Sequence, residues 1–456
     1  MRRTPRIALT LALLAASACS APKQLTIRDV LRAPGFRRPP VILMHGVLGA
    51  VLADRKSGDV AWLTAPSSFR LAPSADLSLP LTPGEGEDRY RAVGMLERIP
   101  VVPGVYTEPI YGPMVDAFRE AGYRVGNCDF PRPDEDAWVF SFDFRRDALS
   151  AVRDLHRAIE RIRELRGDPG EHVAIVAHSF GGLITRYYLM YGAKDVLDEP
   201  NPRPDTAHAH GVSHVVYLGT PHRGSLSLFQ VLLEGYRVGL NSTLLSREVM
   251  STCPLAYQVL PSPGMDLFLD GNKRPAAPSR PSARASWAGL EPFRDSAGKP
   301  LDLYEIAAWE RFGWLPELRA REGGREFLER SLRRARGWWR ALEQEWVPPA
   351  DQLTLSVGGS TTPTPARAVI LDGDSQKPKV RFDLPESLFR ALNPFDRSVL
   401  ETAGDGRVTL ESALSLPYAR RLVGISTHDF VHQDPAVLNN TLLFLMGESL
   451  LGPGKN

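Results

Sequence analysis

The sequence of 456 residues is poor in cysteine, with only Cys19, Cys128 and Cys253. Three cysteines in a chain of this length do not make a disulfide framework, and their spacing resembles no zinc site. A bond between Cys128 and Cys253 stays open. We therefore expect stability to come from a hydrophobic core, which a chain of this size can build, and we expect no metal ion.

An excess of charge of one sign is also missing. The chain has 55 lysines and arginines against 53 acidic residues, a net charge of +2, which gives no field suited to nucleic acid. With 43% hydrophobic and 24% charged residues, the composition is typical of a soluble globular protein. The length allows one large α/β domain with insertions or two ordinary domains.

Long hydrophobic runs are absent too, and the run Ile7–Leu14 is too short to span a bilayer. Three arginines precede this run and the small residues Ala15–Ala18 follow it, which predicts a secretory signal over residues 1–18. Cys19 comes next, as does the lipidated cysteine of bacterial lipoproteins. We expect an exported bacterial lipoprotein, anchored through Cys19 and a tether over 19–40. Ordinary cleavage, giving a periplasmic or secreted protein, is the alternative.

Short apolar runs bounded by turn residues predict buried parallel strands, and an amphipathic helix is predicted over Asp147–Leu165. Strands alternating with helices indicate an α/β fold with a mostly parallel, doubly wound sheet. The predicted strands are Val41–Met44, Val173–Ala177, Val215–Leu218, Leu353–Val357 and Arg421–Ile425.

The core is predicted in two parts, residues 41–263 and 350–456, with a lid segment at about 51–100 in the first part. A helical cap insertion is expected over 264–349, joined to the core through the proline- and arginine-rich stretch 274–286.

The cap contains a basic amphipathic helix, predicted over Arg325–Trp346. Trp338 or Trp339 could contact membrane lipid, with arginines at the headgroups. The favoured alternative is a helix packed on the core with a solvated basic face.

Residues 173–183 read V-A-I-V-A-H-S-F-G-G-L, a buried strand that leads into a turn and a helix with Ser179 at the turn. This context is typical of the nucleophile elbow, where small residues two positions from the serine let strand and helix approach closely. Ala177 and Gly181 hold those positions, so alanine replaces the first glycine of G-x-S-x-G. Ser179 is the predicted nucleophile, and an ordinary strand-helix turn is the alternative.

A serine nucleophile needs donors for the oxyanion, supplied in this context by the residue after the serine and by the loop after an early strand. Phe180 N–H is the first predicted donor. Val47 N–H, in the loop after Val41–Met44, is the second. His45 could be taken for the base, but it precedes the serine, against the expected order of serine, acid and histidine.

Asp405 lies between glycines, and His428 follows a late predicted strand, in the expected order after Ser179. Asp405 is the predicted orienting acid and His428 the predicted base. His432 is a rival base, and Asp429 and Asp434 are rival acids, although Asp434-Pro435 is also typical of a helix start.

At these residues the chain resembles the lecithin:cholesterol acyltransferase and lysosomal phospholipase A2 family of the α/β-hydrolases. The resemblance departs in two places: His45-Gly46 stands where the family often has Pro-Gly, and no cysteines surround Trp62, which could still lie on a lid. The matching stretches are Pro40–Gly49, Val102–Val105, Phe142–Arg145, the serine elbow, Leu218–Gly224, Pro363–Pro365, Gly404–Gly406 and the spacing from His428 to Gly447.

The resemblance implies an α/β-hydrolase fold, a triad of Ser179, Asp405 and His428, an oxyanion hole at Val47 and Phe180, and a lipid ester substrate at a membrane surface. The expected function is acyl hydrolysis or O-acyl transfer without a cofactor. A general carboxylesterase or triacylglycerol lipase is one alternative. A catalytically inactive, membrane-anchored lipid-binding protein is another. The sequence predicts no oligomeric state.

Overall fold

The computed structural model describes residues 38–69, 75–82, 88–102, 105–168, 170–271, 291–295, 298–371, 379–382 and 400–446. The predicted signal segment, Cys19 and the stretch 274–286 lie outside these ranges. No helix within them combines the length and apolar character needed to cross a bilayer.

Seven strands of the described chain form one sheet in which every pairing is parallel. Five of them correspond to the strands that the sequence predicts, which confirms the α/β fold with a parallel sheet. The two others, β7 and β8, are short strands at one edge. In spatial order the strands are β19 (Arg420–Gly424), β14 (Leu353–Gly359), β10 (Val212–Leu218), β9 (Val173–His178), β1 (Val41–Met44), β8 (Ala137–Phe140) and β7 (Val125–Asn127).

The chain builds the sheet outward from β1, first to β7 and β8 on one side and then to β9, β10, β14 and β19 on the other. The strand order thus changes direction between β8 and β9. In open α/β sheets, ligands bind outside the carboxyl ends of the strands at such a point. The segments that follow β1 and β9 are those with the predicted oxyanion loop and nucleophile.

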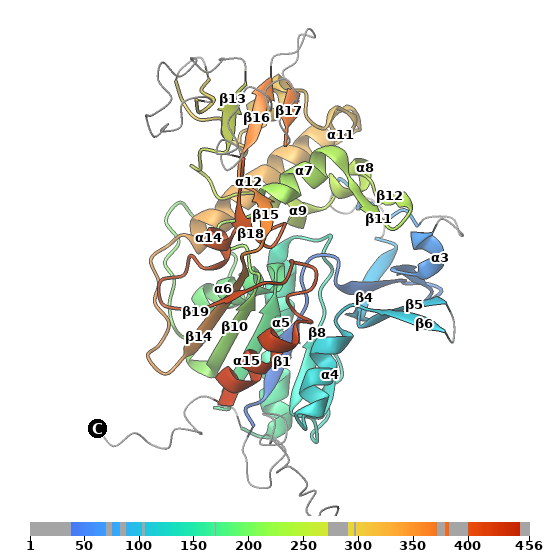
Figure 1. Ribbon diagram of the computed structural model, residues 1–456, viewed down its shortest axis with the longest axis vertical. Coiled ribbons are helices and arrows are strands. Elements are labelled where there is room, and N and C mark those ends of the chain that lie inside the picture. The colour runs from blue at the N-terminus through green and yellow to red at the C-terminus, as the bar shows by residue number, and fades with distance from the viewer. Residues whose placement is uncertain are drawn as a thin grey trace, which may run out of the picture.

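Helices cover both faces of the sheet, because alternate strand residues point to opposite sides. Ile42 and Met44 pack with the core that includes α5 (Ala148–Arg166) and α6 (Phe180–Tyr191). Val41 and Leu43 pack with the core that includes α4 (Gly112–Glu120) and α15 (Pro435–Met446). The result is a three-layer sandwich, the α/β-hydrolase fold (Figure 1).

Helix α5 agrees with its prediction to within one residue. It begins after Asp147, whose side chain accepts a hydrogen bond from the Leu149 amide. It ends at Gly167, which has a left-handed conformation with φ of 67°.

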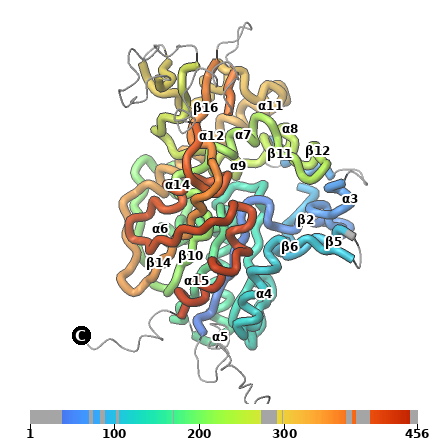
Figure 2. The backbone as a smooth tube through the Cα atoms, in the orientation of Figure 1, coloured from blue at the N-terminus to red at the C-terminus, as the bar shows by residue number. Residues whose placement is uncertain are grey.

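A helical cap lies above the carboxyl ends of the strands, and the backbone trace in Figure 2 shows it stacked on the sheet domain. The predicted insertion contains α10, α11 and α12, and α9 packs against α12. The elements of this region are α7 (Leu226–Glu234), β11 (Tyr236–Val238), β12 (Asn241–Leu245), α8 (Arg247–Met250), α9 (Pro254–Gln258), β13 (Phe268–Asp270), α10 (Ile306–Arg311), α11 (Pro316–Ala320), α12 (Gly324–Leu342), β16 (Ala368–Leu371) and β17 (Lys379–Arg381).

The tryptophans of α12 face inward. Trp338 and Trp339 are both 0% exposed, and Trp338 stacks on Tyr187 of α6 with ring centroids 4.8 Å apart. The idea that these tryptophans contact membrane lipid is therefore wrong, and the alternative of a helix packed on the core is confirmed. The two buried indoles add a large apolar area to the packing of α12, and a side chain buried in this way is not accessible to lipid.

A second peripheral region projects beside α4 and contains most of the predicted lid segment (Figure 1). Trp62 is buried there and donates a hydrogen bond from Nε1 to the Leu48 carbonyl at 3.0 Å. This contact fastens the region to the loop after β1. Its elements are β2 (Ala50–Asp54), β3 (Val60–Trp62), α3 (Ala65–Ser68), β4 (Tyr90–Met95), β5 (Arg98–Val102) and β6 (Tyr106–Pro109).

The remaining described elements are short. They are η1 (Ala209–Gly211), β15 (Thr362–Pro365), β18 (Glu401–Gly404) and α14 (Leu410–Ala413). β15 and β18 pair antiparallel and carry the chain to Asp405.

Candidate active site

Ser179 lies in the turn between β9 and α6 with φ of 53° and ψ of −123°, a conformation that residues with a side chain rarely adopt. The turn is held by a hydrogen bond of 2.8 Å from the Ser179 amide to the Leu218 carbonyl on β10. A Cβ atom on Gly181 would lie 2.6 Å from the His45 carbonyl oxygen, so glycine is required there. These are the features of a nucleophile elbow.

The structure brings together the three residues predicted as nucleophile, base and acid. His428 Nε2 is 2.9 Å from Ser179 Oγ, and His428 Nδ1 is 2.8 Å from Asp405 Oδ2. All three side chains are buried, with exposures of 7% for Ser179, 7% for His428 and 1% for Asp405. A proton can pass between Ser179 and His428 while Asp405 holds the other ring nitrogen.

Asp405 is held in its ionised form by its neighbours. Burial raises the pKa of this carboxyl, but His428 and hydrogen bonds from the Val408 and Arg407 amides outweigh burial, so the net pKa shift is downward. The two amides donate to Oδ1 at 2.7 Å and 3.0 Å, which leaves Oδ2 for His428. An ionised, immobile Asp405 favours the His428 tautomer with the proton on Nδ1.

The predicted oxyanion donors flank Ser179. Phe180 is the first residue of α6, so its amide has no acceptor one turn earlier in the helix. Val47 lies in a turn closed by a 3.2 Å hydrogen bond from the Gly49 amide to the Gly46 carbonyl. A Cβ atom on Gly46 would be 2.6 Å from Ser179 Cβ, so this turn packs directly on Ser179.

Each rival to the predicted triad has another partner. His432 Nε2 contacts the Ile110 carbonyl at 3.0 Å, and Asp434 caps α15 by accepting from the Ala436 amide. Asp429 forms an ion pair with Arg407. Of the acids considered, Asp405 alone is hydrogen-bonded to His428 within the described chain.

His45 is completely buried away from solvent and binds its neighbours on the β1 loop. Its Nδ1 is 2.7 Å from the Gly46 carbonyl oxygen, and its Nε2 accepts from the Phe142 amide at 3.2 Å. Burial lowers the pKa of His45 to about 4, so the ring is neutral at ordinary pH. It supports the oxyanion turn.

Two side chains that the sequence did not single out, Tyr111 and His178, connect the predicted oxyanion turn to the predicted base, His428. The Gly46 amide donates to Tyr111 Oη at 2.8 Å, and Tyr111 Oη is 2.7 Å from His178 Nδ1. His178 Nε2 lies 3.1 Å from the His428 carbonyl oxygen and must donate to it. Tyr111 therefore donates to His178 Nδ1, and a directed chain of hydrogen bonds runs from the oxyanion turn to the backbone of His428.

Burial lowers the pKa of His178 well below its usual range, and the nearby His432 and His428 lower it further. The ring is thus neutral, as the directed chain requires. His178 is next to Ser179 in the sequence, but Tyr111 is 67 residues earlier, and no local pattern relates the two.

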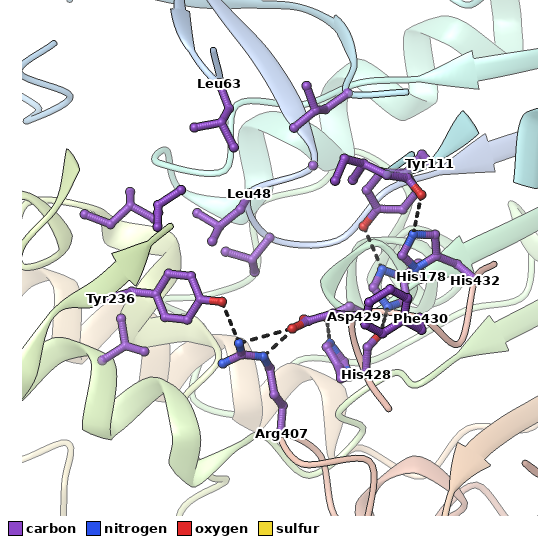
Figure 3. A pocket seen from close by; sticks show the side chains of 18 of the residues that line it. Leu48, Leu63, Tyr111, His178, Tyr236, Arg407, His428, Asp429, Phe430 and His432 are labelled. Atoms are coloured by element: carbon purple, nitrogen blue, oxygen red, sulfur yellow. Dashed lines mark hydrogen bonds and ion pairs between the residues drawn. The ribbon is translucent and has the colours of Figure 1, made fainter. Parts of the chain in front are cut away.

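A cavity of about 330 Å³ opens beside Ser179 and His428. Much of its wall is apolar and comes from the β1 loop, the lid segment and α7 (Figure 3). Six of the apolar side chains are Leu48, Leu63, Leu228, Val231, Val238 and Met250. Such a wall suits an apolar ligand such as an aliphatic chain.

Cys128 and Cys253 are both buried and free, so the disulfide that the sequence left open does not form between them. Burial raises the pKa of the Cys253 thiol to about 12, which makes it unreactive at neutral pH. Across the described ranges no cluster of three or more His, Cys, Asp or Glu side chains could hold a metal ion.

The predicted family resemblance is confirmed over part of the chain. Residues 101–274 match the model of the lecithin:cholesterol acyltransferase family. This segment contains Ser179 but ends before Asp405 and His428, whose assignment rests on the geometry above. No curated protein sequence matches the chain significantly.

Solved structures resemble this one at low sequence identity. A chain in the crystal structure of the Tle4–Tli4 complex has 12% identity and a TM-score of 0.51, over 91% of this chain and 99% of that chain. A Bacillus licheniformis lipase, BlEst2 in its mature form, has 13% identity and a TM-score of 0.34, over 92% and 95%. A gene product of Listeria innocua has 12% identity and a TM-score of 0.31, over 90% and 94%. The first of these likenesses supports the fold.

Proposed function

From the similarity to the lecithin:cholesterol acyltransferase family and the α/β-hydrolase fold, we propose that the chain is a serine-dependent lipid acyl hydrolase or O-acyltransferase. Its substrates are phospholipids or other lipid esters. The family match supports the coarser part of this proposal, an enzyme that acts on lipid esters. The serine mechanism is inferred from the site.

One observation carries the proposal: the unbroken contact from Ser179 Oγ through both ring nitrogens of His428 to Asp405 Oδ2. Chance placement of these three side chains would not give two hydrogen bonds of less than 3 Å on one imidazole. The strained elbow at Ser179 adds a second reason, since such strain persists at functional sites.

The mechanism follows from the geometry. Ser179 Oγ attacks the ester carbonyl carbon while His428 Nε2 takes the hydroxyl proton. The Val47 and Phe180 amides stabilise the negative charge that develops on the carbonyl oxygen. His428 then returns the proton to the leaving alkoxide oxygen, the C–O bond breaks, and an alcohol or lysolipid departs. Water or another hydroxyl attacks the acyl-enzyme by the same steps, and Ser179 is regenerated.

The apolar cavity beside Ser179 supports a substrate with an aliphatic acyl chain. A general carboxylesterase or triacylglycerol lipase shares every catalytic group and differs by its preference for short or neutral esters. A catalytically inactive lipid-binding protein would have no use for the strained serine or for the aligned His428.

We also propose export and membrane anchoring through Cys19, on the grounds of the N-terminal sequence alone. Labelling of producing cells with a fatty-acid analogue is expected to mark the mature protein. An unlabelled mature protein, or a mature chain that begins after another residue, would remove the anchor.

The main test measures acyl release from mixed phospholipid vesicles, with and without a sterol acceptor, by the full-length protein and by Ser179→Ala. We expect the substitution to lower the rate by about 10⁴-fold or more, because the nucleophile is lost. Ser415→Ala is the matched control, since this serine binds the Ser412 carbonyl outside the site.

The ratio of free fatty acid to new sterol ester then distinguishes hydrolysis from transfer. Full activity in Ser179→Ala would remove Ser179 from its role. Absence of activity from the unmodified protein on phospholipids and on simple esters alike would favour the lipid-binding alternative.

A further inference from the structure

A charged group lies on the otherwise mostly apolar wall of the cavity. Arg407, Asp429 and Tyr236 form it, and all three line the cavity with Ser179 and His428. In Figure 3 the Arg407 guanidinium lies between the Tyr236 hydroxyl and the Asp429 carboxylate. Arg407 is two residues after Asp405, and Asp429 follows His428, so this group is built on the two turns that carry the acid and the base.

The guanidinium is held in place without being saturated. Nη2 donates to Tyr236 Oη at 2.7 Å, and the guanidinium carbon lies 4.9 Å from the centre of the tyrosine ring. Nε and Nη2 reach the two Asp429 oxygens at 3.2 Å and 3.3 Å. No hydrogen bond from Nη1 to another group is found in the part of the chain that the structure describes.

The pairing with Asp429 is loose. Strong bonds between a guanidinium and a carboxylate are about 2.7–2.9 Å long, shorter than both bonds here. The Asp429 side chain is 58% exposed and the Arg407 side chain 29% exposed. Water can therefore solvate Asp429 when another anion takes its place beside Arg407.

The other charged residues of the cavity wall are Glu108 and Arg237. Arg237 is exposed and belongs to neither catalytic turn, whereas Arg407 is oriented by the Tyr236 hydroxyl and ring. Arg407 is thus the cation whose position relative to the reacting ester is fixed.

We infer that Arg407 binds the phosphate of a phospholipid substrate and so makes this enzyme favour phospholipids over neutral esters of the same acyl chain. This inference rests on the proposed function. A guanidinium offers two parallel N–H donors that match a phosphate group, and a single glycerol joins that phosphate to the ester. A neutral diacylglycerol has no anion to offer, so it gains nothing from Arg407.

The test compares two substrates that differ at the phosphate but share their acyl chains, dihexanoylphosphatidylcholine and 1,2-dihexanoylglycerol, both below their critical micelle concentrations. Monomeric substrates remove any effect of charge on vesicle binding. The proteins are the full-length chain, Arg407→Ala, Arg407→Lys and, as control, Arg223→Ala. Arg223 pairs with Glu411 on the surface and does not line the cavity.

We expect Arg407→Ala to lower kcat/KM for the phospholipid by about ten- to hundredfold, mainly through KM, and to change kcat/KM for the diacylglycerol by less than about threefold. Arg407→Lys keeps the charge without the planar fork, so its kcat/KM for the phospholipid should lie between those of the unmodified protein and Arg407→Ala. Arg223→Ala should leave the ratio unchanged. Equal losses on both substrates would assign Arg407 a structural role and overturn the inference.

Asp429→Asn gives an opposite expectation. It removes the carboxylate that competes for the guanidinium, so KM for the phospholipid should fall. If the ion pair only braced the two turns, Asp429→Asn and Arg407→Ala would break the same pair and lose activity alike, and that outcome would also overturn the inference.

Two further substrates identify what is bound. Dihexanoylphosphatidylglycerol has the phosphate without a cationic group and should show the same loss in Arg407→Ala; a loss restricted to the choline lipid would refute phosphate binding. Submillimolar inorganic phosphate should not change the diacylglycerol reaction, and a strong effect would indicate an independent anion site. Diacylglycerol hydrolysis that depends on Ser179 keeps the proposed function intact even if the inference about Arg407 fails.

Discussion

Two arginines of this protein show how the same side chain serves different ends. Arg145 is completely buried, and its guanidinium donates to the carboxylates of Asp143 and Asp88 and to the carbonyls of Leu77 and Tyr90. Arg407 is partly exposed, with a loose carboxylate partner and a cavity beside it. The guanidinium that already uses most of its N–H donors, that of Arg145, joins segments of the protein. The guanidinium with donors left over, that of Arg407, can bind a ligand.

The comparison extends to the regions around them. Arg145 ties residues 75–82 and β4 to the segment before α5, so the lid region depends on it. The catalytic region instead contains the neighbouring buried rings of Tyr111, His178, His428 and His432, each held by one or two hydrogen bonds. Changes in the first region should affect stability at every pH, and changes in the second should affect the reaction rate or the dependence of stability on pH.

The largest effect is expected from His428→Ala. Loss of the base should lower kcat by about 10⁴-fold or more while the melting temperature changes little. Ester hydrolysis and thermal unfolding are measured on the same preparation. If His428→Ala lowered the melting temperature as well as the activity, His428 would belong with the residues that stabilise the fold.

Arg145→Ala should show the reverse pattern. It removes the fully buried cation of Asp143 and Asp88 and leaves them only the half-exposed Arg146. Loss of one partner of a buried ion pair costs about 3–5 kcal/mol of the free energy of unfolding. Urea unfolding measures this loss. Arg146→Ala, which removes a cation that is 42% exposed from the same two carboxylates, should cost less. A stable variant with low activity would contradict the division between the two regions.

Acid should destabilise the protein through its buried histidines. Burial lowers the pKa of His45 and of His432 from 6.5 to about 4 in the folded chain. The unfolded chain therefore binds more protons between these values, and stability present above pH 6.5 is lost as the pH falls toward 4. The loss at pH 5 is about 2 kcal/mol per histidine.

Unfolding free energies measured from pH 7 to pH 5 test this slope. His432→Gln should reduce the slope of unfolding free energy against pH by about one proton. Arg145→Ala should lower stability at every pH and leave this slope unchanged. An unchanged slope in His432→Gln would show that the ring titrates normally in the folded protein.

The smallest effect is expected from Tyr111→Phe. It removes one hydroxyl and leaves the Gly46 amide and His178 Nδ1 without their partner, which should lower kcat by about tenfold with KM nearly unchanged. Tyr123→Phe is a control, because Tyr123 packs on Phe118 away from the cavity. A change in KM alone would mean that Tyr111 acts on the substrate and does not position the oxyanion turn.

Much of the fold could be predicted because its signals are local. Continuous apolar runs predicted five strands of the sheet, and spaced apolar residues predicted α5. β7 and β8 were missed: β7 is three residues long and only partly buried, and β8 is four residues between turns. Short strands have little periodicity, and the pairing of β8 with β1 and of β7 with β8 is a property of the assembled sheet.

The sequence by itself determined the elbow at Ser179, the order of Ser179, Asp405 and His428, and the start of α5 near Asp147. The residues that define each of these features are neighbours or follow a known order. Only the tertiary structure decided that Trp338 faces α6, that Tyr111 reaches His178, and that Arg407 meets Tyr236 across 171 positions of the chain. Hydrogen bonds and ring contacts act over a few ångströms, so side chains far apart in sequence become partners only when the packed sheet and cap place them at that distance.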